Sequence, residues 1–292
     1  MIMEIFKYKY RNIPLIPGKV LKEILHERFS EKYISLDLGI SVSKVIKNFN
    51  TLYFEEYGIS LRIDGIANFR IKDDSVYAIV NDRLLELSIP TKNKFYKLKA
   101  PYPNKAPTVE ISGVHMHRIK NIDPWSDAMQ KVRKARIRRG HVVLDTCTGL
   151  GYTAIGSLRF GASRVYTVEV DEIVLAISQF NPWSRFLEDT RITILLGDVY
   201  DVVDFFDNEV FDRIIHDPPR FSLSGHLYSE SFYRKLYRKL KPGGILFHYT
   251  GAPGERRRVN IVKGVAERLR KIGFYVKVDS KVQGVIAFKF RF

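Results

Sequence analysis

The order of apolar and polar positions predicts two parts of different character. In the first part, Met3–Tyr10 alternates like a strand and Lys19–Phe29 has helical spacing. Short alternating runs separated by turn-forming residues follow at Tyr33–Leu38, Ser60–Ile63, Ala67–Ile71, Val76–Val80 and Leu84–Ile89. We therefore predict a small β-rich α+β domain over residues 1–118.

The second part alternates between buried strands and amphipathic helices. The predicted strands are Val142–Asp145, Arg164–Val170, Ile192–Leu196, Phe211–His216, Gly244–Tyr249, Phe274–Val278 and Val285–Phe290. The predicted helices are Asn121–Gly140, Tyr152–Phe160, Glu172–Phe180, Val202–Phe206, Glu230–Leu240 and Glu255–Ile272. This order predicts an α/β domain over residues 119–292, with a Rossmann-like, doubly wound, mainly parallel sheet and an antiparallel edge.

The composition is that of a globular protein. Of the 292 residues, 45% are hydrophobic and 27% are charged. No apolar run reaches the roughly 18 residues of a membrane span, and the N-terminus lacks the apolar core of a signal peptide. A single cysteine excludes an internal disulfide and is typical of a reducing compartment, so we expect a cytoplasmic protein.

The charge favours a polyanionic partner. The formal net charge is +16 and the isoelectric point is near 9.7, which suggests RNA, although solubility alone is an alternative. Thr91–Pro107 interleaves lysines with aromatic residues and is either a solvated linker or a phosphate-contacting segment. His115 and His117 would face the same way on a strand, but no third ligand lies near them, so we expect no metal.

A glycine turn between a predicted strand and a predicted helix marks a cofactor loop. Gly149 and Gly151 let the backbone approach a ligand closely, and the following helix offers free N–H donors. Asp145 ends the strand, where its charge would repel the pyrophosphate of NAD but suit the ammonium group of S-adenosyl-L-methionine.

Two further acids stand at predicted strand ends. Glu169 follows Gly149 by 20 residues, where it would bind ribose hydroxyls, and Asp198 would meet the adenine amino group. We therefore predict S-adenosyl-L-methionine as the cofactor. The predicted cofactor-binding residues are Asp145, Thr146, Cys147, Gly149, Gly151, Tyr152, Thr153, Glu169, Asp198 and Val199.

The run Asp217-Pro218-Pro219-Arg220-Phe221 follows the fourth strand of the second part. The prolines fix the turn and remove N–H donors, so the carboxylate and nearby carbonyls form a rim of hydrogen-bond acceptors. Such a rim can hold an exocyclic amine with its lone pair aimed at a transferable group. We predict Asp217, Pro218, Pro219, Arg220 and Phe221 as the catalytic residues.

These motifs resemble the class I, Rossmann-like methyltransferases, over about residues 121–292. In more detail the chain resembles a poorly characterised archaeal family of predicted methyltransferases with a DPPRF motif. The stretches that carry this resemblance are Val109–Gly113, His115–Arg118, Leu144–Tyr152, Asn181–Ser184, His216–Ser222 and His248–Gly251. The resemblance implies a stacking aromatic directly after the two prolines. Here Arg220 holds that place, so we expect its guanidinium plane, or a nearby Phe221, Tyr228, Phe232 or Tyr233 ring, to stack instead.

The sequence thus predicts a methyltransferase that uses S-adenosyl-L-methionine to modify an exocyclic nitrogen of a base in tRNA or rRNA, with the first domain positioning the RNA. One alternative is methylation of a protein or small amine. Another is transfer of the aminopropyl or aminocarboxypropyl arm of the cofactor. A third is an RNA-binding protein without activity. Cys147 could act as a nucleophile, but its place in the cofactor loop favours a packing role.

Overall fold

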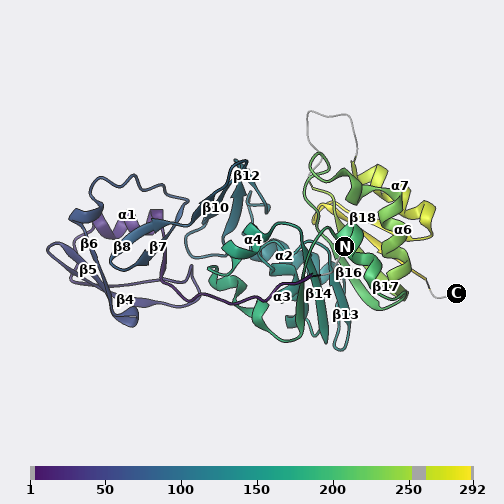
Figure 1. Ribbon diagram of the computed structural model, residues 1–292, viewed down its shortest axis with the longest axis horizontal. Helices are drawn as coiled ribbons and strands as arrows, with labels where there is room; N and C mark the ends of the chain where they lie inside the picture. The colour runs from purple at the N-terminus through teal and green to yellow at the C-terminus, as the bar shows by residue number, and fades with distance from the viewer. Residues whose placement is uncertain (1–3, 252–260, 291–292) are drawn as a thin grey trace. The chain divides into compact units, whose positions relative to one another are not determined.

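The computed structural model describes residues 4–251 and 261–290 (Figure 1). The chain forms two compact units, which we describe one at a time. The C-terminal unit comprises Met1–Tyr8, Ser126–Glu172 and Phe186–Phe292, and the N-terminal unit comprises Lys9–Trp125 and Ile173–Arg185. The predicted domain boundary at residue 119 therefore leaves two segments in the wrong unit. The first eight residues belong to the C-terminal unit, and residues 173–185 belong to the N-terminal unit.

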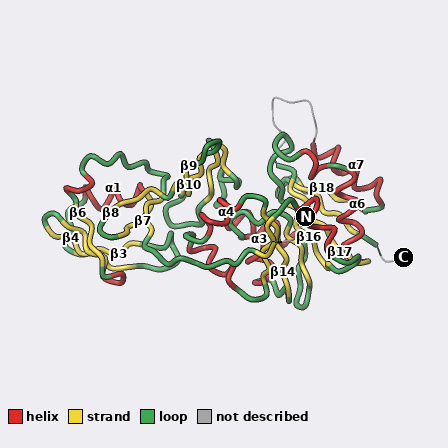
Figure 2. The backbone as a smooth tube through the Cα atoms, in the orientation of Figure 1, coloured by secondary structure: helices red, strands yellow, loops and turns green. Residues whose placement is uncertain are grey.

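A mixed sheet forms the centre of the C-terminal unit (Figure 2). Its strands are β1 Glu4–Ile5, β13 Val142–Asp145, β14 Arg164–Glu169, β15 Ile192–Leu196, β16 Phe211–His216, β17 Leu240–Tyr249, β18 Tyr275–Asp279 and β19 Gly284–Phe288. In the described residues their order is β1-β15-β14-β13-β16-β17-β19-β18. Strands β13 to β17 pair in parallel, while β1 and β19 pair antiparallel to their neighbours. The predicted mainly parallel sheet is confirmed.

Helices cover both faces of this sheet. They are α2 Pro124–Lys134, α3 Tyr152–Arg159, α5 Val199–Val202, α6 Glu230–Lys239 and α7 Ile261–Ile272, with 3-10 turns at Val203–Phe205 and Gly225–Tyr228. A further 3-10 turn, Pro182–Glu188, crosses from one unit into the other. Leu144, Ile214 and Leu246 pack against α5, α6 and α7 in one apolar core. The residues before Leu144 and Ile214 in each strand point to the other face, where α2 and α3 lie. The first six residues of the predicted helix Glu255–Ile272 lie outside the described residues.

The N-terminal unit is rich in short strands. Its elements are β2 Leu15–Pro17, α1 Gly18–His26, β3 Glu31–Ile34, β4 Ser43–Asn48, β5 Thr51–Phe54, β6 Ile59–Arg62, β7 Val76–Val80, β8 Arg83–Glu86, β9 Ser88–Pro90, β10 Phe95–Lys99, β11 Thr108–Ile111, β12 Val114–His115 and most of α4 Glu172–Ser178, with 3-10 turns at Glu55–Tyr57 and Asp64–Ile66. In the described residues they form sheets β3-β4-β5-β6, β2-β7-β8 and β12-β11-β10-β9. The strand predicted over Ala67–Ile71 is wrong, because a turn and a loop follow the 3-10 turn Asp64–Ile66 in that stretch.

The lysine-rich segment is not a solvated linker. It contains β10, which pairs with β9 and β11. The Lys99 ammonium is buried and lies 2.8 Å from Asp74, while Lys97 lies 3.6 Å from Glu86. Lys97 and Lys99, two of the lysines of this segment, therefore already have acidic partners within the N-terminal unit.

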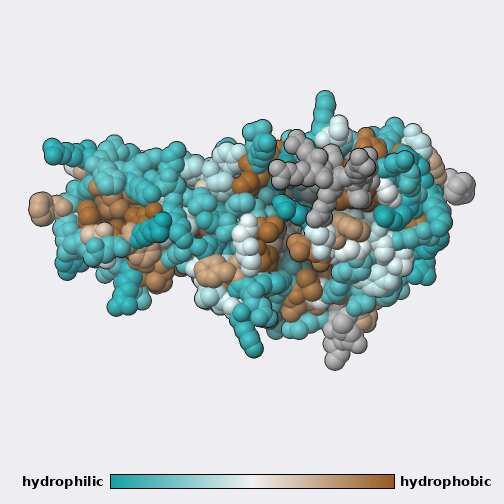
Figure 3. All heavy atoms as spheres, turned by 90° about the horizontal axis from the view of Figure 1, so that it is seen from above, coloured by the Kyte–Doolittle hydropathy of each residue, from teal (hydrophilic) through white to brown (hydrophobic). Residues whose placement is uncertain are grey.

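The face of the molecule shown in Figure 3 is mostly hydrophilic. Hydrophilic side chains cover most of its area and hydrophobic ones form separate patches. Within the described residues, no helix combines the length and the apolar character needed to cross a membrane.

Candidate active site

The cofactor loop lies where β13 leaves the sheet and α3 begins. Gly149 and Gly151 have φ values of +52° and +77°, which suit glycine. A Cβ on Gly151 would also lie 2.5 Å from the Leu187 side chain. Thr148 anchors the loop, because its N–H donates to the Val168 carbonyl. The turn therefore places the start of α3 directly beside the carboxyl edge of the sheet.

Asp145 lies beneath this loop rather than on its surface. Its side chain is fully buried, and its two carboxylate oxygens accept hydrogen bonds from the Thr153 and Thr167 hydroxyls at 3.0 and 2.8 Å. Burial raises the pKa of Asp145 to about 8, against the opposing effect of these hydroxyls. A direct contact between Asp145 and the cofactor's ammonium group, as we expected from the sequence, does not fit this geometry, so we assign Asp145 to the support of the loop.

Glu169 fits the cofactor role better. It ends β14, is nearly buried, and accepts a hydrogen bond from the Gly149 N–H at 2.8 Å. Its other oxygen accepts from the N–H groups of Val170 and Asp171 at 3.0 Å. Burial raises its pKa, and these three N–H groups oppose that rise. The remaining lone pairs of a carboxylate fixed in this way can accept hydrogen bonds from ribose hydroxyls.

Asp198 is engaged on both oxygens. One oxygen caps α5 by accepting from the Tyr200 N–H at 2.9 Å, and the other lies 2.9 Å from His226 Nε2. Val199, the first residue of α5, is buried. Each oxygen keeps a second lone pair, so Asp198 can still accept a hydrogen bond from an adenine amino group beside these two contacts.

The sharpest feature of the site is a buried lysine between two carboxylates. Lys131 on α2 places its ammonium 2.6 Å from Asp217 and 2.9 Å from Asp127, and 4.0 Å from the centre of the Tyr249 ring. The Lys131 and Asp127 side chains are 4% and 3% exposed, whereas Asp217 is 20% exposed. The cluster therefore opens to the outside mainly through Asp217.

The electrostatics of this cluster keep Lys131 protonated. Burial would lower the pKa of Lys131, but the Asp217 and Asp127 carboxylates outweigh it and raise that pKa above its ordinary value. Burial raises the pKa of the Asp217 carboxyl, and the Lys131 ammonium opposes that rise. Sequence reasoning missed Lys131 and Asp127, because an Asp and a Lys four residues apart on a helix are usually a surface ion pair.

The two prolines hold an aromatic rim around Asp217. The Tyr228 hydroxyl donates to the Pro219 carbonyl at 2.9 Å, and the Phe221 ring packs edge-on against Tyr228. Phe221 is 44% exposed and Arg220 is also exposed, so both can meet a planar acceptor. The suggestion that Phe232 or Tyr233 might stack on the acceptor is wrong, because both rings are fully buried in the apolar core.

A buried histidine links the cofactor loop to the acceptor loop. His216 Nδ1 lies 2.7 Å from the Thr146 hydroxyl, and its Nε2 donates to the Leu227 carbonyl at 3.0 Å. Burial lowers the pKa of His216 to about 3, so the ring stays neutral. Cys147 lies in the cofactor loop, and burial raises the pKa of its thiol, which disfavours a nucleophilic role.

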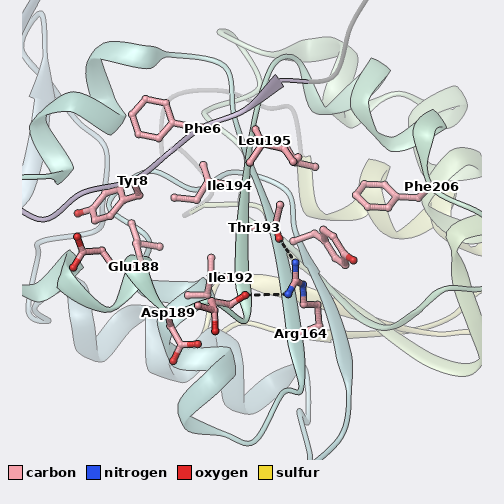
Figure 4. A pocket seen from close by; sticks show the side chains of 14 residues that line it. Phe6, Tyr8, Arg164, Glu188, Asp189, Ile192, Thr193, Ile194, Leu195 and Phe206 are labelled. Atoms are coloured by element: carbon pink, nitrogen blue, oxygen red, sulfur yellow. Dashed lines mark hydrogen bonds between the residues drawn. The ribbon is translucent and has the colours of Figure 1, made fainter.

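A hollow lies at the β1 edge of the same sheet, away from the two loops (Figure 4). It has a volume of about 400 Å³ and is lined by Phe6, Tyr8 and Phe206 among others. Arg164, the first residue of β14, donates to the Thr193 hydroxyl at 2.7 Å across its floor. The carboxyl end of β14 is five residues further on, about 16 Å along the strand. The Arg164 end of this hollow is therefore remote from the cofactor loop.

The described residues contain no group of three or more His, Cys, Asp or Glu side chains placed to hold a metal ion. His117 Nδ1 instead lies 2.9 Å from the Thr108 hydroxyl.

Comparisons with known proteins agree with this architecture. Residues 151–280 match the family profile "Spermine/spermidine synthase domain". Among solved structures, the chain is similar to a spermidine synthase in complex with the transition state analogue AdoDATO, with a TM-score of 0.56 and 19% identity over 81% of this chain and 78% of that one. It is also similar to MNMC2 from Aquifex aeolicus, with a TM-score of 0.53 and 18% identity over 67% and 71%. At such identities the structures show a shared fold.

These matches bear out the Rossmann-like class I fold and the predicted cofactor class, S-adenosyl-L-methionine and its close analogues. Between the sequence-based functions, they favour the aminopropyl alternative over methyl transfer to RNA. The chain is also 44% identical over 282 residues to "Uncharacterized protein MJ1233" from Methanocaldococcus jannaschii, a match that covers 94% of this chain and 95% of that protein. With this identity along nearly the full length of both proteins, the chain belongs to the same family as the M. jannaschii protein.

Proposed function

We propose that this protein alkylates the nitrogen of an amine with a donor of the S-adenosyl-L-methionine type. We also propose that Asp217 accepts a hydrogen bond, and then the proton, from that nitrogen. The observation that carries the proposal is the partly open Asp217 carboxylate beside the cofactor loop. β13 and β16 are neighbours, and the Thr146 N–H donates to the Ile215 carbonyl at 3.0 Å. The acceptor loop and the cofactor loop therefore leave the sheet side by side.

The residues fit such a donor. Glu169 would hold its ribose, the glycine turn and the start of α3 would surround it, and Asp145 would keep the turn rigid. When bound, the donor supplies a carbon activated by a sulfonium. Asp217 would orient the amine and take its proton as the nitrogen is alkylated, while the neighbouring Lys131 ammonium, at 2.6 Å, opposes the effect of burial and favours the ionised carboxylate.

The first candidate for the transferred group is aminopropyl, with a small amine as acceptor. The match of residues 151–280 to the spermine/spermidine synthase profile favours it. With both carboxyls ionised, Asp127, Lys131 and Asp217 carry one net negative charge. This charge suits an acceptor that has a second, protonated amino group, while the attacking nitrogen is neutral.

The second candidate is methyl transfer to an exocyclic nitrogen of an RNA base. The net charge of +16 favours it, as do Arg220 and Phe221, which are exposed next to Asp217 and can contact a phosphate and a base. The two candidates share the Asp217 chemistry and differ in donor and acceptor.

The test is a donor-and-acceptor panel. Purified protein is incubated with S-adenosyl-L-methionine labelled in the methyl group or in the carbon chain, and with decarboxylated donor labelled in the propyl chain. Polyamines and total RNA are the acceptors. Chain label on a polyamine supports the first candidate, and methyl label in RNA nucleosides supports the second. Absence of label in every combination, or label transferred equally by Asp217→Asn, would contradict the proposal.

A further inference from the structure

The C-terminal unit carries a cationic groove that none of the roles above uses. It lies between the end of α2 and the β18–β19 hairpin and has a volume of about 560 Å³. Arg133, Lys134 and Arg136 line it from the α2 side, and Lys277 and Asp279 line it from β18. Four cations against one carboxylate give the groove a net charge of +3.

Most of this charge is available to a ligand. Lys134 is paired with Asp279 at 2.6 Å. Within the described part of the chain, Arg133, Arg136 and Lys277 form no ion pair with an acid. Each lies over an aromatic ring instead, those of Phe160, Phe288 and Tyr275 respectively, at 5.5 to 5.8 Å. All three are exposed. Cations that protein acids do not neutralise are suited to phosphates.

Two exposed aromatic rings lie outside the residues that line the groove: Tyr275 is on the edge strand β18 and Phe290 follows β19. Tyr275 stands two residues before Lys277, so both side chains leave the same face of β18. Tyr275 is 48% exposed and Phe290 is 53% exposed, and their ring centres lie 5.7 Å apart. Exposed rings next to unpaired cations are the combination that binds single-stranded nucleic acids, since bases stack while cations contact the backbone.

The groove also lies close to the proposed acceptor site. Lys134 contacts Asp279 and Lys131 contacts Asp217, and these two lysines are three residues apart on α2. Three residues of an α-helix rise about 5 Å along its axis. Asp279 and the end of β17 also lie at the same edge of the sheet, because Tyr249 and Asp279 both pair with Gly284. A nucleic-acid strand bound in the groove would thus pass beside the Asp217 loop.

We propose that this groove binds single-stranded RNA, with Arg133, Arg136 and Lys277 on phosphates and with Tyr275 and Phe290 stacking on bases. The inference rests on the RNA candidate of the proposed function and names the surface that would hold that acceptor. It assigns RNA binding to the C-terminal unit, whereas the sequence had suggested the first domain and its lysine-rich segment.

The test measures binding without any donor, so it can fail while the Asp217 chemistry stands. A fluorescent single-stranded RNA is titrated with the full chain at several salt concentrations. The triple variant Arg133→Ala, Arg136→Ala, Lys277→Ala should bind at least tenfold more weakly at physiological salt. The slope of log affinity against log salt should fall by about 2, roughly 0.7 for each lost phosphate contact. Tyr275→Ala should weaken binding about fivefold or more without changing that slope.

The matched control removes three cations that already have acidic partners. Arg191 lies 2.6 Å from Asp189, while Arg234 and Lys271 lie 2.7 and 2.9 Å from Glu230. Alanine at these three positions changes the net charge by the same amount and should leave affinity within about twofold. Equal losses in both triple variants would overturn the proposal, as would competition by polyglutamate as effective as that by unlabelled RNA, or no RNA binding by the wild type. Thermal unfolding of each variant checks that the fold is retained.

Discussion

Replacing Lys131 with Met is the most informative single perturbation of the site. Methionine keeps most of the apolar stem of the lysine but removes the charge between Asp127 and Asp217. Both carboxylates then remain in a region where the Lys131 side chain is only 4% exposed. Breaking a buried ion pair by removing one partner costs about 3–5 kcal/mol, so we expect the free energy of unfolding at pH 7 to fall by about that amount.

The same substitution should move the pH dependence of activity. The Lys131 ammonium opposes the rise that burial causes in the pKa of Asp217, so its loss raises that pKa further. Because transfer needs ionised Asp217, the acid limb of the rate profile should move to higher pH in Lys131→Met.

Urea unfolding of Lys131→Met, Asp217→Asn and the double variant measures the coupling between the two residues. Lys271→Met is the matched control, because its partner Glu230 is partly exposed and such surface pairs contribute about 0–1 kcal/mol. If Lys131→Met unfolds within about 1 kcal/mol of the wild type and keeps the same acid limb, the buried cluster does not act as described.

Three further predictions concern the residues that support the site. Gly151→Ala would place a Cβ 2.5 Å from Leu187 at a φ of +77°, so it should destabilise the fold by about 1–3 kcal/mol and weaken cofactor binding. The control Gly140→Ala, at a φ of +86° with no atom within 4 Å, should cost less. Equal shifts of the unfolding temperature in the two variants would contradict this. His216→Leu leaves the buried hydroxyl and carbonyl at its two ring nitrogens without partners and should cost about 2–4 kcal/mol in urea unfolding; a change below about 1 kcal/mol would argue against the link. Burial raises the pKa of Asp145 from 3.8 to about 8, so the folded chain keeps a proton that the unfolded chain releases, and the free energy of unfolding falls as pH rises between these values. Asp145→Asn should flatten this fall between pH 5 and 8. An unchanged slope of the free energy of unfolding against pH would refute the assignment.

The sequence predicted the central sheet well because its strands are rich in Val, Ile and Leu and alternate with helical segments. β13, β15 and β16 begin and end at the predicted residues. The pairing of β1 with β15 could not be predicted, because the two segments are almost two hundred residues apart and periodicity carries no partner information. The β4–β5 hairpin was missed because Lys44 and Lys47 interrupt its apolar pattern.

The site was predictable in its motifs but not in its contacts. The glycine turn and the acids at strand ends indicated where a cofactor pocket would lie. The burial of Asp145 beneath two threonine hydroxyls depends on how α3 packs on the sheet, which no local pattern encodes. The same holds for Lys131, which contacts Asp217 across 86 residues of chain. Sequence spacing thus indicated where the candidate site lies but not the Lys131 charge beside Asp217.

The most direct test of the central claim compares the wild type with Asp217→Asn in two measurements on the same preparations. Calorimetry gives the affinity for the donor, and single-turnover mass spectrometry gives the rate of alkyl transfer to whichever amine the donor panel identifies. We predict that Asp217→Asn binds the donor within about threefold of the wild type and transfers about 10²–10⁴ times more slowly. A variant that transfers at the wild-type rate, or that loses donor binding in proportion to activity, would contradict the role assigned to Asp217.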